Sequence, residues 1–275
     1  MLLALDVGNT NITIGIFKNG ELADHRRLRT VREQTSDEWG ILLSSLLRFA
    51  ALDSQALDGI IISSVVPPLN PALAEMAQRY FDTQAIFVTA ETDTGLTVLY
   101  ENPAEVGADR IVNSVAALHK YGGPCIIVDL GTAITFDAIS AKAEYLGGII
   151  AAGIGISAEA LFSRTARLPL VDFRKPAALI GRNTVVSMQS GLYYGAIGAI
   201  DGIVERLIED LGADTRVIAT GGQAGMIAGG SRYIRHVDEN LTLEGLRLIW
   251  DRTRSASKSE SGGTRADRGV RPTEQ

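Results

Sequence analysis

The sequence predicts an α/β protein made of two similar halves and a short tail. Three observations support this. A motif near the N-terminus recurs in the second half, apolar strand-like segments alternate with helix-like segments, and 46% hydrophobic with 21% charged residues is typical of a globular protein. We therefore expect halves over residues 1–122 and 123–252, and a disordered tail over 253–275 that is poor in apolar residues.

The repeat is the most informative feature. Leu2–Phe17 and Cys125–Ile139 each contain an apolar run, an aspartate, a glycine and an Ile-Thr pair. If one residue is skipped after Gly8, the copies align as follows: Asp6 with Asp129, Gly8 with Gly131, Thr10 with Thr132, Ile12 with Ile134 and Thr13 with Thr135. We expect each copy to form a buried strand, a tight turn and a returning strand.

The turn in each copy suits a phosphate chain and its cation. Backbone N–H groups and threonine hydroxyls bind phosphate oxygens, while a neighbouring carboxylate binds a metal ion or its water shell. Asp6 and Asp129 are the candidate carboxylates. The alternative is two unrelated hairpins with polar turns, and it leaves the matching flanks unexplained.

The other elements of the first half follow in chain order. Asn19-Gly20 predicts a hairpin turn before a strand at 21–28. Thr35 and Glu38 predict a capping box that opens a helix through residue 52. Further on, the apolar patterns predict a strand, a helix, a strand and a helix over 59–66, 71–81, 85–89 and 103–121.

The second half repeats this order. We expect strands within 126–150, helices near 158–168, 183–211 and 243–252, and a strand at 216–220 that ends at Gly221-Gly222. The long helix carries small residues at a spacing that favours close contact with another helix, for example at a dimer interface, rather than a membrane setting: Gly191, Gly195, Gly198 and Gly202.

The helix expected at 103–121 carries Gly107-Ala108-Asp109-Arg110 just before the second turn. An adjacent acid and base on a helix are usually a solvated pair. Their position beside a phosphate turn favours a functional interpretation. Asp109 would accept a hydroxyl proton, and Arg110 would bind an acidic group of a substrate.

Charge and composition exclude several classes of protein. The net charge is 26 − 32 = −6; the segment from Arg252 onward carries +3 and the rest −9, which argues against binding nucleic acid through general electrostatics. The N-terminus lacks the basic segment of a signal peptide, and no apolar run is long enough to span a membrane. One cysteine, Cys125, excludes an intrachain disulfide, so we expect a cytoplasmic protein.

Two other nucleotide-binding patterns were weighed. The Gly-x-x-x-x-Gly-Lys-Ser/Thr loop is absent from the sequence. Gly153-Ile-Gly155 follows an apolar strand and partly matches a dinucleotide fingerprint, with Asp172 downstream. That interpretation does not account for the repeated aspartates, so we place it behind the phosphate-turn interpretation.

Taken together, the motifs resemble those of a known family. The order of DVGNTN at 6–11, GADR at 107–110, DLGTA at 129–133, Asn183-Thr184 and TGG at 220–222 is similar to that of the type III pantothenate kinases. This family belongs to the actin, Hsp70 and sugar kinase superfamily. The resemblance covers Leu2 to about Arg252 and implies two actin/Hsp70-like, or ribonuclease H-like, halves with a cleft between them.

The resemblance implies an ATP-dependent phosphorylation of pantothenate to 4′-phosphopantothenate, the first step of coenzyme A biosynthesis. It implies a homodimer, Mg²⁺ with ATP, and K⁺ or NH₄⁺ bound at Asp129. Asp109 would be the base, and Asp6 would assist Mg²⁺. The implied ATP-binding residues are Asp6, Val7, Gly8, Asn9, Thr10, Asn11, Ile12, Thr13 and Thr132, and the implied substrate residues are Tyr100, Gly107, Ala108, Asp109, Arg110 and Thr184.

Two alternatives share the expected fold: a non-catalytic regulatory relative, and a kinase of another small hydroxyl compound. The sequence also departs from the family where Ala152 replaces a frequent proline in the segment Gly147–Gly153. Proline would fix φ at that position, so the change loosens the loop without removing a functional side chain.

Overall fold

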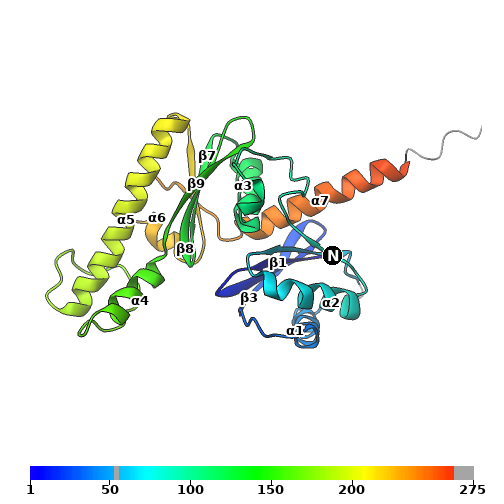
Figure 1. The fold of residues 1–275 in the computed structure, drawn as a ribbon, viewed down its shortest axis with the longest axis horizontal. Helices are drawn as coiled ribbons and strands as arrows, with labels where there is room; N and C mark the ends of the chain where they lie inside the picture. The colour runs from blue at the N-terminus through cyan, green and yellow to red at the C-terminus, as the bar shows by residue number, and fades with distance from the viewer. Residues whose placement is uncertain (53–55, 263–275) are drawn as a thin grey trace, which may run out of the picture.

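The computed structural model describes residues 1–52 and 56–262, and its strands form two mixed sheets (Figure 1). The first sheet has the order β3-β2-β1-β4-β5. Strand β1 pairs antiparallel with β2 and parallel with β4, as expected for a hairpin followed by a helical crossover. The strands are β1 (Leu2–Val7), β2 (Asn11–Lys18), β3 (Glu21–Arg29), β4 (Gly59–Ser64) and β5 (Ala85–Phe87).

The second sheet has the order β11-β10-β7-β8-β9-β6. Strand β7 pairs antiparallel with β8 and parallel with β10, which reproduces the centre of the first sheet. Its strands are β6 (Thr97–Val98), β7 (Cys125–Leu130), β8 (Ala133–Ile139), β9 (Glu144–Ala152), β10 (Arg216–Thr220) and β11 (His236–Val237).

Helices cover the faces of both sheets (Figure 1). The α-helices are α1 (Ser36–Phe49), α2 (Asn70–Phe81), α3 (Ala108–Tyr121), α4 (Ile154–Arg164), α5 (Thr184–Leu211), α6 (Ala224–Ala228) and α7 (Leu241–Gly262), and the 3-10 turns are η2 (Pro67–Leu69) and η3 (Pro103–Glu105). The capping box predicted at α1 is present: Thr35 and Glu38 bond each other's backbone N–H groups. Asn183 caps α5 by accepting from the Val186 N–H at 2.9 Å.

The register of the two hairpins confirms the sequence repeat. Asp6 stands opposite Thr13 in the first hairpin, and Asp129 stands opposite Thr135 in the second. The skipped residue lies in the turn, because the N–H of Gly8 bonds the carbonyl of Asn11 whereas the N–H of Gly131 bonds that of Ala133. Each aspartate is therefore the second-last residue of a strand and precedes a glycine-containing turn.

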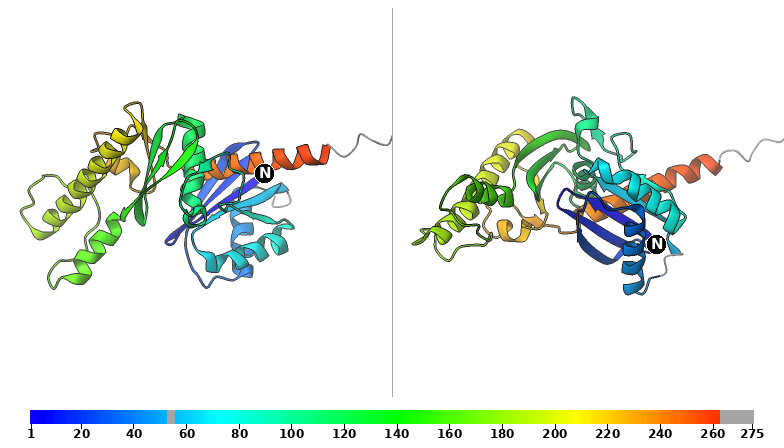
Figure 2. Two further views of the ribbon diagram at one scale, coloured as in Figure 1. Left: turned by 45° about the horizontal axis from the view of Figure 1, so that its top comes forward. Right: turned by 60° about the horizontal axis from the view of Figure 1, so that its bottom comes forward.

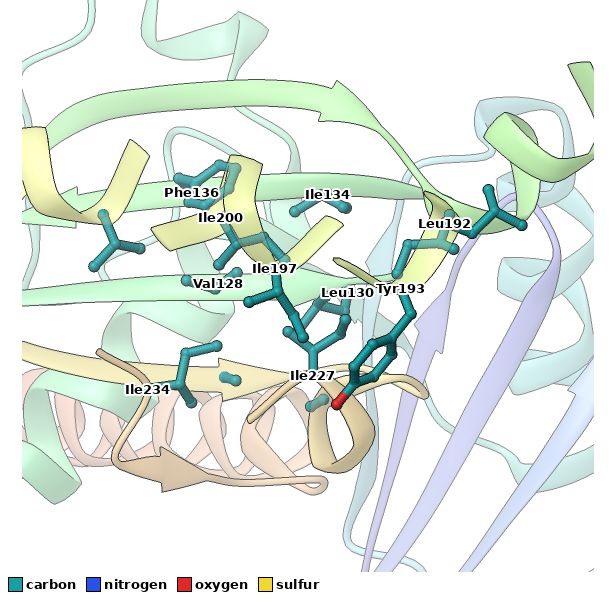
Figure 3. Close-up of a cluster of buried hydrophobic side chains, with 14 of the residues drawn as sticks. Val128, Leu130, Ile134, Phe136, Leu192, Tyr193, Ile197, Ile200, Ile227 and Ile234 are labelled. Carbon is teal, nitrogen blue, oxygen red and sulfur yellow. The ribbon is translucent and has the colours of Figure 1, made fainter. Parts of the chain in front are cut away.

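Side chains of the second sheet pack against α4, α5 and α6. Figure 3 shows Val128, Leu130, Ile134 and Phe136 of the sheet facing Leu192, Ile197 and Ile200 of α5, with Ile227 of α6 beside them. All of these side chains are buried. Burial of each is worth about 1.5–3 kcal/mol, so this cluster fixes the sheet that carries Asp129.

Helix α7 packs against the first sheet, although the sequence places it in the second half. Leu243, Leu246 and Ile249 of α7 share a core cluster with Ala4 and Ile61 of the first sheet. Helix α3 contacts both sheets, since Val112 joins that cluster while Ala116 and Ala117 join a cluster with β7 and β10. The views of Figure 2 show α3 and α7 beside the place where the sheets approach each other. The two halves are thus tied by helices.

Several elements differ from the sequence prediction: α4 spans Ile154–Arg164 instead of about 158–168, and the short elements β6, α6 and β11 were not predicted. The helix expected at 103–121 is a 3-10 turn followed by α3, because Gly107 has an extended ψ of 138° and acts as the N-cap. Helix α7 continues past Arg252 to Gly262, so the expected disorder is corrected for 253–262; Thr253 bonds the Trp250 carbonyl, and the Arg254 guanidinium lies over the Trp250 ring. Residues 263–275 of the expected tail lie outside the described residues.

Among the helices that the structure describes, none is both long enough and apolar enough to cross a membrane.

Candidate active site at the junction of the two halves

The two glycine-containing turns meet where the halves join. The hydroxyls of Thr10 and Thr132 lie 2.9 Å apart, although the residues belong to different copies of the repeat. Thr10 and Thr132 are both exposed, so a ligand can reach their side chains. The predicted phosphate turns therefore form one continuous site, called the junction site below.

Three carboxylates converge on the junction site. Asp6 and Asp129 extend from the ends of β1 and β7, and Asp109 lies in the first turn of α3. All three are partly buried. The N–H of Arg110 donates to Asp109 Oδ1 at 2.8 Å, which holds that carboxylate at the positive end of the helix.

Burial and mutual repulsion change the acidity of these groups. The pKa of Asp6 rises to about 8, chiefly through burial and then through the charges of Asp109 and Asp129. The pKa of Asp129 rises to about 7 through burial and the charges of Asp109 and Asp137. Burial also raises the pKa of Asp109. A site that concentrates so much negative charge is suited to a bound cation.

The position of Asp129 is fixed by a chain of two hydrogen bonds. Thr242 of α7 donates its hydroxyl to Asn113 Oδ1 at 2.7 Å, and Asn113 Nδ2 donates to Asp129 Oδ2 at 3.2 Å. Asn113 is completely enclosed, with 1% of its surface exposed. Helices α3 and α7 thus orient the Asp129 carboxylate through its Oδ2 atom, and Oδ1 takes part in neither of these two bonds.

The oxygens around Asp129 fit a cation. Gly221 has a φ of +90°, and a β-carbon there would lie 2.7 Å from Asp129 Oδ1 and 2.8 Å from the Leu130 carbonyl oxygen. Glycine is therefore required where the Gly221 backbone passes close to the Asp129 carboxylate and the Leu130 carbonyl, and oxygen atoms of these kinds are the ligands that hard cations prefer. Within residues 1–52 and 56–262, no group of three or more His, Cys, Asp or Glu side chains could by itself hold a metal ion. Backbone oxygens and phosphates would have to complete the coordination.

Arg110 is held in a buried ion pair beside Asp109. Its Nε donates to Asp137 Oδ1 at 2.7 Å, and the Tyr145 hydroxyl donates to the same oxygen at 2.8 Å. Asp137 is fully buried, and burial raises its pKa to about 6 although Arg110 opposes the shift. Arg110 Nη2 is also buried and has no hydrogen-bond partner among the described residues. The Nη2 amino group of the guanidinium therefore lacks a hydrogen-bond acceptor within the described chain.

Gly148 of β9 makes room for this arginine, and the neighbouring Gly147 lies beside Tyr100. A β-carbon at Gly148 would lie 2.5 Å from Arg110 Nη2, and one at Gly147 would lie 3.6 Å from the Tyr100 ring. The rings of Tyr100 and Tyr145 have centroids 6.4 Å apart. The predicted substrate residues Tyr100 and Gly107–Arg110 are thus brought together.

Thr184, the remaining predicted substrate residue, lies elsewhere in the same chain. It is the first residue of α5, which begins at the outer end of the second half and away from α3 in Figures 1 and 2. There it lines a cavity of about 710 Å³ between α4 and α5, together with Leu161, Arg182, Ser187 and Met188.

Sequence reasoning did not single out Asp137, Tyr145 or Thr242. A signal existed for Asp137, since it is a charged residue within the apolar strand Ala133–Ile139 and so requires a buried partner. Tyr145 and Thr242 gave no such signal, because their roles depend on contacts between distant segments.

The raised pKa of Asp6 predicts an unusual dependence of stability on pH. The folded protein holds a proton on Asp6 up to about pH 8, whereas the unfolded chain releases it near 3.8. This contribution is therefore fully present below about pH 4 and is lost as pH rises to about 8. Without ATP and cations, Asp6→Asn should raise the free energy of unfolding at pH 8 by about 1–3 kcal/mol and change it little at pH 4.

Thermal unfolding at both pH values measures this effect, with the exposed loop variant Asp214→Asn as the control. A melting temperature of Asp6→Asn that stays below that of the parent protein at pH 8 would contradict the raised pKa assigned to the buried Asp6.

Comparison with known proteins places these features in a family. The family model described as type III pantothenate kinase matches residues 2–206. A protein of this description from Solibacter usitatus is 65% identical over 252 residues, which cover 92% of this chain and 97% of the relative. One from Koribacter versatilis is 54% identical and covers 96% of this chain and 100% of its own length.

Solved structures support the fold. A Baf family transcriptional activator from Campylobacter jejuni has a TM-score of 0.56 at 20% identity, covering 92% of this chain and 99% of that chain. The activator of 2-hydroxyisocaproyl-CoA dehydratase from Clostridium difficile, with bound ADPNP, has a TM-score of 0.51 at 10% identity over 98% of this chain and 99% of that one. The expected duplicated actin/Hsp70-like fold is confirmed.

Proposed function

The chain belongs to the type III pantothenate kinase family, and from this premise we propose that it transfers the γ-phosphoryl group of ATP to the primary hydroxyl of pantothenate. The product is 4′-phosphopantothenate, and the reaction opens coenzyme A biosynthesis. The observation that carries the proposal is the placement of Asp109 and Arg110 beside two joined phosphate turns. The enzyme would act in the cytoplasm, where ATP is available.

ATP is proposed to bind along the first turn. The backbone and side chains of Asp6–Thr13 offer N–H and hydroxyl donors, and Thr132 extends these donors into the second half through its contact with Thr10. Such donors stabilise the charge that develops on a transferring phosphoryl group. Because the two turns come from different halves, a nucleotide bound between them would also hold the halves together.

Asp109 is proposed as the general base. Its carboxylate is fixed by the Arg110 N–H, and burial raises its pKa toward the neutral range in which proton acceptors work well. It would orient the pantothenate hydroxyl in line with the γ-phosphoryl group and accept its proton. The free Nη2 of Arg110 would bind the anionic end of pantothenate, with Tyr100 beside it.

Cations are proposed at the two strand ends. Asp6 would hold Mg²⁺ that accompanies ATP, and Asp129 with the neighbouring Leu130 carbonyl would hold K⁺ or NH₄⁺. When bound, these ions supply positive charge that offsets the phosphates and the carboxylates.

The Asp129 assignment predicts a cation dependence. Replacing K⁺ with Na⁺ at constant ionic strength should lower kcat, because selection among hard cations depends on the size and the ligand number of the oxygen site. Asp129→Asn should show low activity in both salts. Initial rates in the two chloride salts measure this effect. Equal rates of the parent enzyme in both salts would contradict the assignment of a monovalent cation to Asp129.

A homodimer is proposed to complete the site. One face of α5 carries three glycines at which an added β-carbon would have no atom within 4 Å: Gly191, Gly195 and Gly198. A second α5 could approach this face closely, as at helix interfaces rich in small residues. Thr184 lies on the same helix, remote from Asp109 of its own chain, so it would reach pantothenate bound to the partner.

The test of the proposed activity is a panel of acceptors. The purified protein, ATP, Mg²⁺ and K⁺ are incubated with pantothenate, glucose or N-acetylglucosamine, and ADP release is followed. We expect turnover with pantothenate alone. Turnover with a sugar and none with pantothenate would reassign the chain to another kinase activity.

A further inference from the structure

The register of the first sheet places an arginine next to the phosphate turn. Asp6 of β1 stands opposite Thr13 of β2, and Thr13 stands opposite Arg27 of β3. Directly opposite residues of neighbouring strands point to the same face. Arg27 therefore extends from the same face as Asp6, two strands away, which is about 10 Å and within reach of an arginine side chain.

Contacts with the second half show where this side chain points. Arg27 Nη1 lies 3.5 Å from the position that a β-carbon of Gly222 would occupy. Gly222 follows β10 and Gly221, which borders the Asp129 oxygens. The guanidinium thus spans from β3 of one sheet to the Gly221-Gly222 turn of the other, across the junction site.

Nothing in the described part of the chain neutralises this arginine at close range. Arg27 is exposed, and its side chain takes part in no hydrogen bond or ion pair among the described residues. Its charge does lower the pKa of Asp6, although burial and two other carboxylates outweigh it. An arginine that influences Asp6 without forming an ion pair with it is available to an anion that enters the junction site.

We propose that Arg27 binds the terminal phosphates of ATP and stabilises the charge of the transferring γ-phosphoryl group. The inference rests on the proposed function and adds a residue to the site. The Arg27 guanidinium donates two parallel hydrogen bonds to phosphate oxygens, a bidentate geometry that its planar shape favours. Because Arg27 also borders Gly222, binding of ATP draws the two halves together over the phosphates.

The test compares Arg27 with its neighbour Arg26. Arg26 stands opposite Ile14 on the other face of the sheet and pairs with Asp24 at 2.9 Å, so it is a matched control. Affinities for ATP, ADP and AMP are measured by calorimetry for the parent protein, Arg27→Gln, Arg27→Lys and Arg26→Gln. We expect Arg27→Gln to weaken ATP binding about tenfold to a hundredfold and to leave AMP binding unchanged.

Arg27→Lys should recover part of the lost ATP affinity, because lysine keeps the positive charge but cannot form the bidentate hydrogen bonds. The control Arg26→Gln should bind all three nucleotides as the parent protein does. Equal ATP affinity in Arg27→Gln, or an equal loss for AMP, would overturn the proposal. The binding measurement needs no acceptor. A parent protein that binds ATP but does not phosphorylate pantothenate would refute the proposed function and still test Arg27.

Discussion

Replacing Asp109 with asparagine is expected to lower kcat for pantothenate phosphorylation by about two to four orders of magnitude. Asparagine preserves the shape of the side chain and can still accept the 2.8 Å bond from the Arg110 N–H, but it cannot accept the hydroxyl proton. The KM for ATP should change little, since Asp109 is proposed to face the acceptor. Steady-state rates at saturating ATP measure the effect.

The control for this variant is Asp214→Asn, which removes a carboxylate from the exposed loop after α5. It should behave as the parent enzyme. Retention of most of the parent kcat by Asp109→Asn would remove Asp109 as the base. Loss of ATP binding in the same variant would show instead that the substitution disturbs the phosphate turns.

Mixing two inactive variants is expected to restore activity. If Thr184 serves the partner's site, Asp109→Asn and the exposed-residue variant Thr184→Arg should each be nearly inactive alone. In a mixed dimer, the Asp109 of one chain meets the Thr184 of the other, so one of its two sites is intact. Equal amounts of both chains should therefore recover about one quarter of the parent activity.

Analytical sedimentation of each variant is the control, because the mixing experiment requires that both variants form dimers. If Thr184 acted within its own chain, every site of the mixture would carry one defect and no activity would return. A companion variant, Gly195→Arg, should give monomers with little activity, since the new side chain would fill the exposed face of α5.

The parts of the fold that local sequence determines were predictable. The repeat gave both hairpins and the correspondence of Asp6 with Asp129, and the caps at Thr35 and Asn183 located the starts of α1 and α5. These features depend on residues within a few positions of each other. The turn at Asn19-Gly20, with positive φ at both residues, is of the same kind.

Features that depend on distant contacts were not predictable. The apolar face of α7 indicates burial but cannot say against which sheet, and it packs on the first. Strand β6 has only two residues, too few for a recognisable alternation. Arg27 is one of several charged residues in β3, and it gains its position only through the register with Thr13 and the approach of Gly222.

The most direct test of the central claim is the identity of the product. Pantothenate and ATP are incubated with the parent enzyme and with Asp109→Asn, and the products are examined by mass spectrometry and phosphorus NMR. The account predicts one phosphoryl group on the primary hydroxyl of pantothenate with the parent enzyme, and hardly any with the variant. Phosphate released to water, or pantothenate left unmodified while ATP binds, would contradict it.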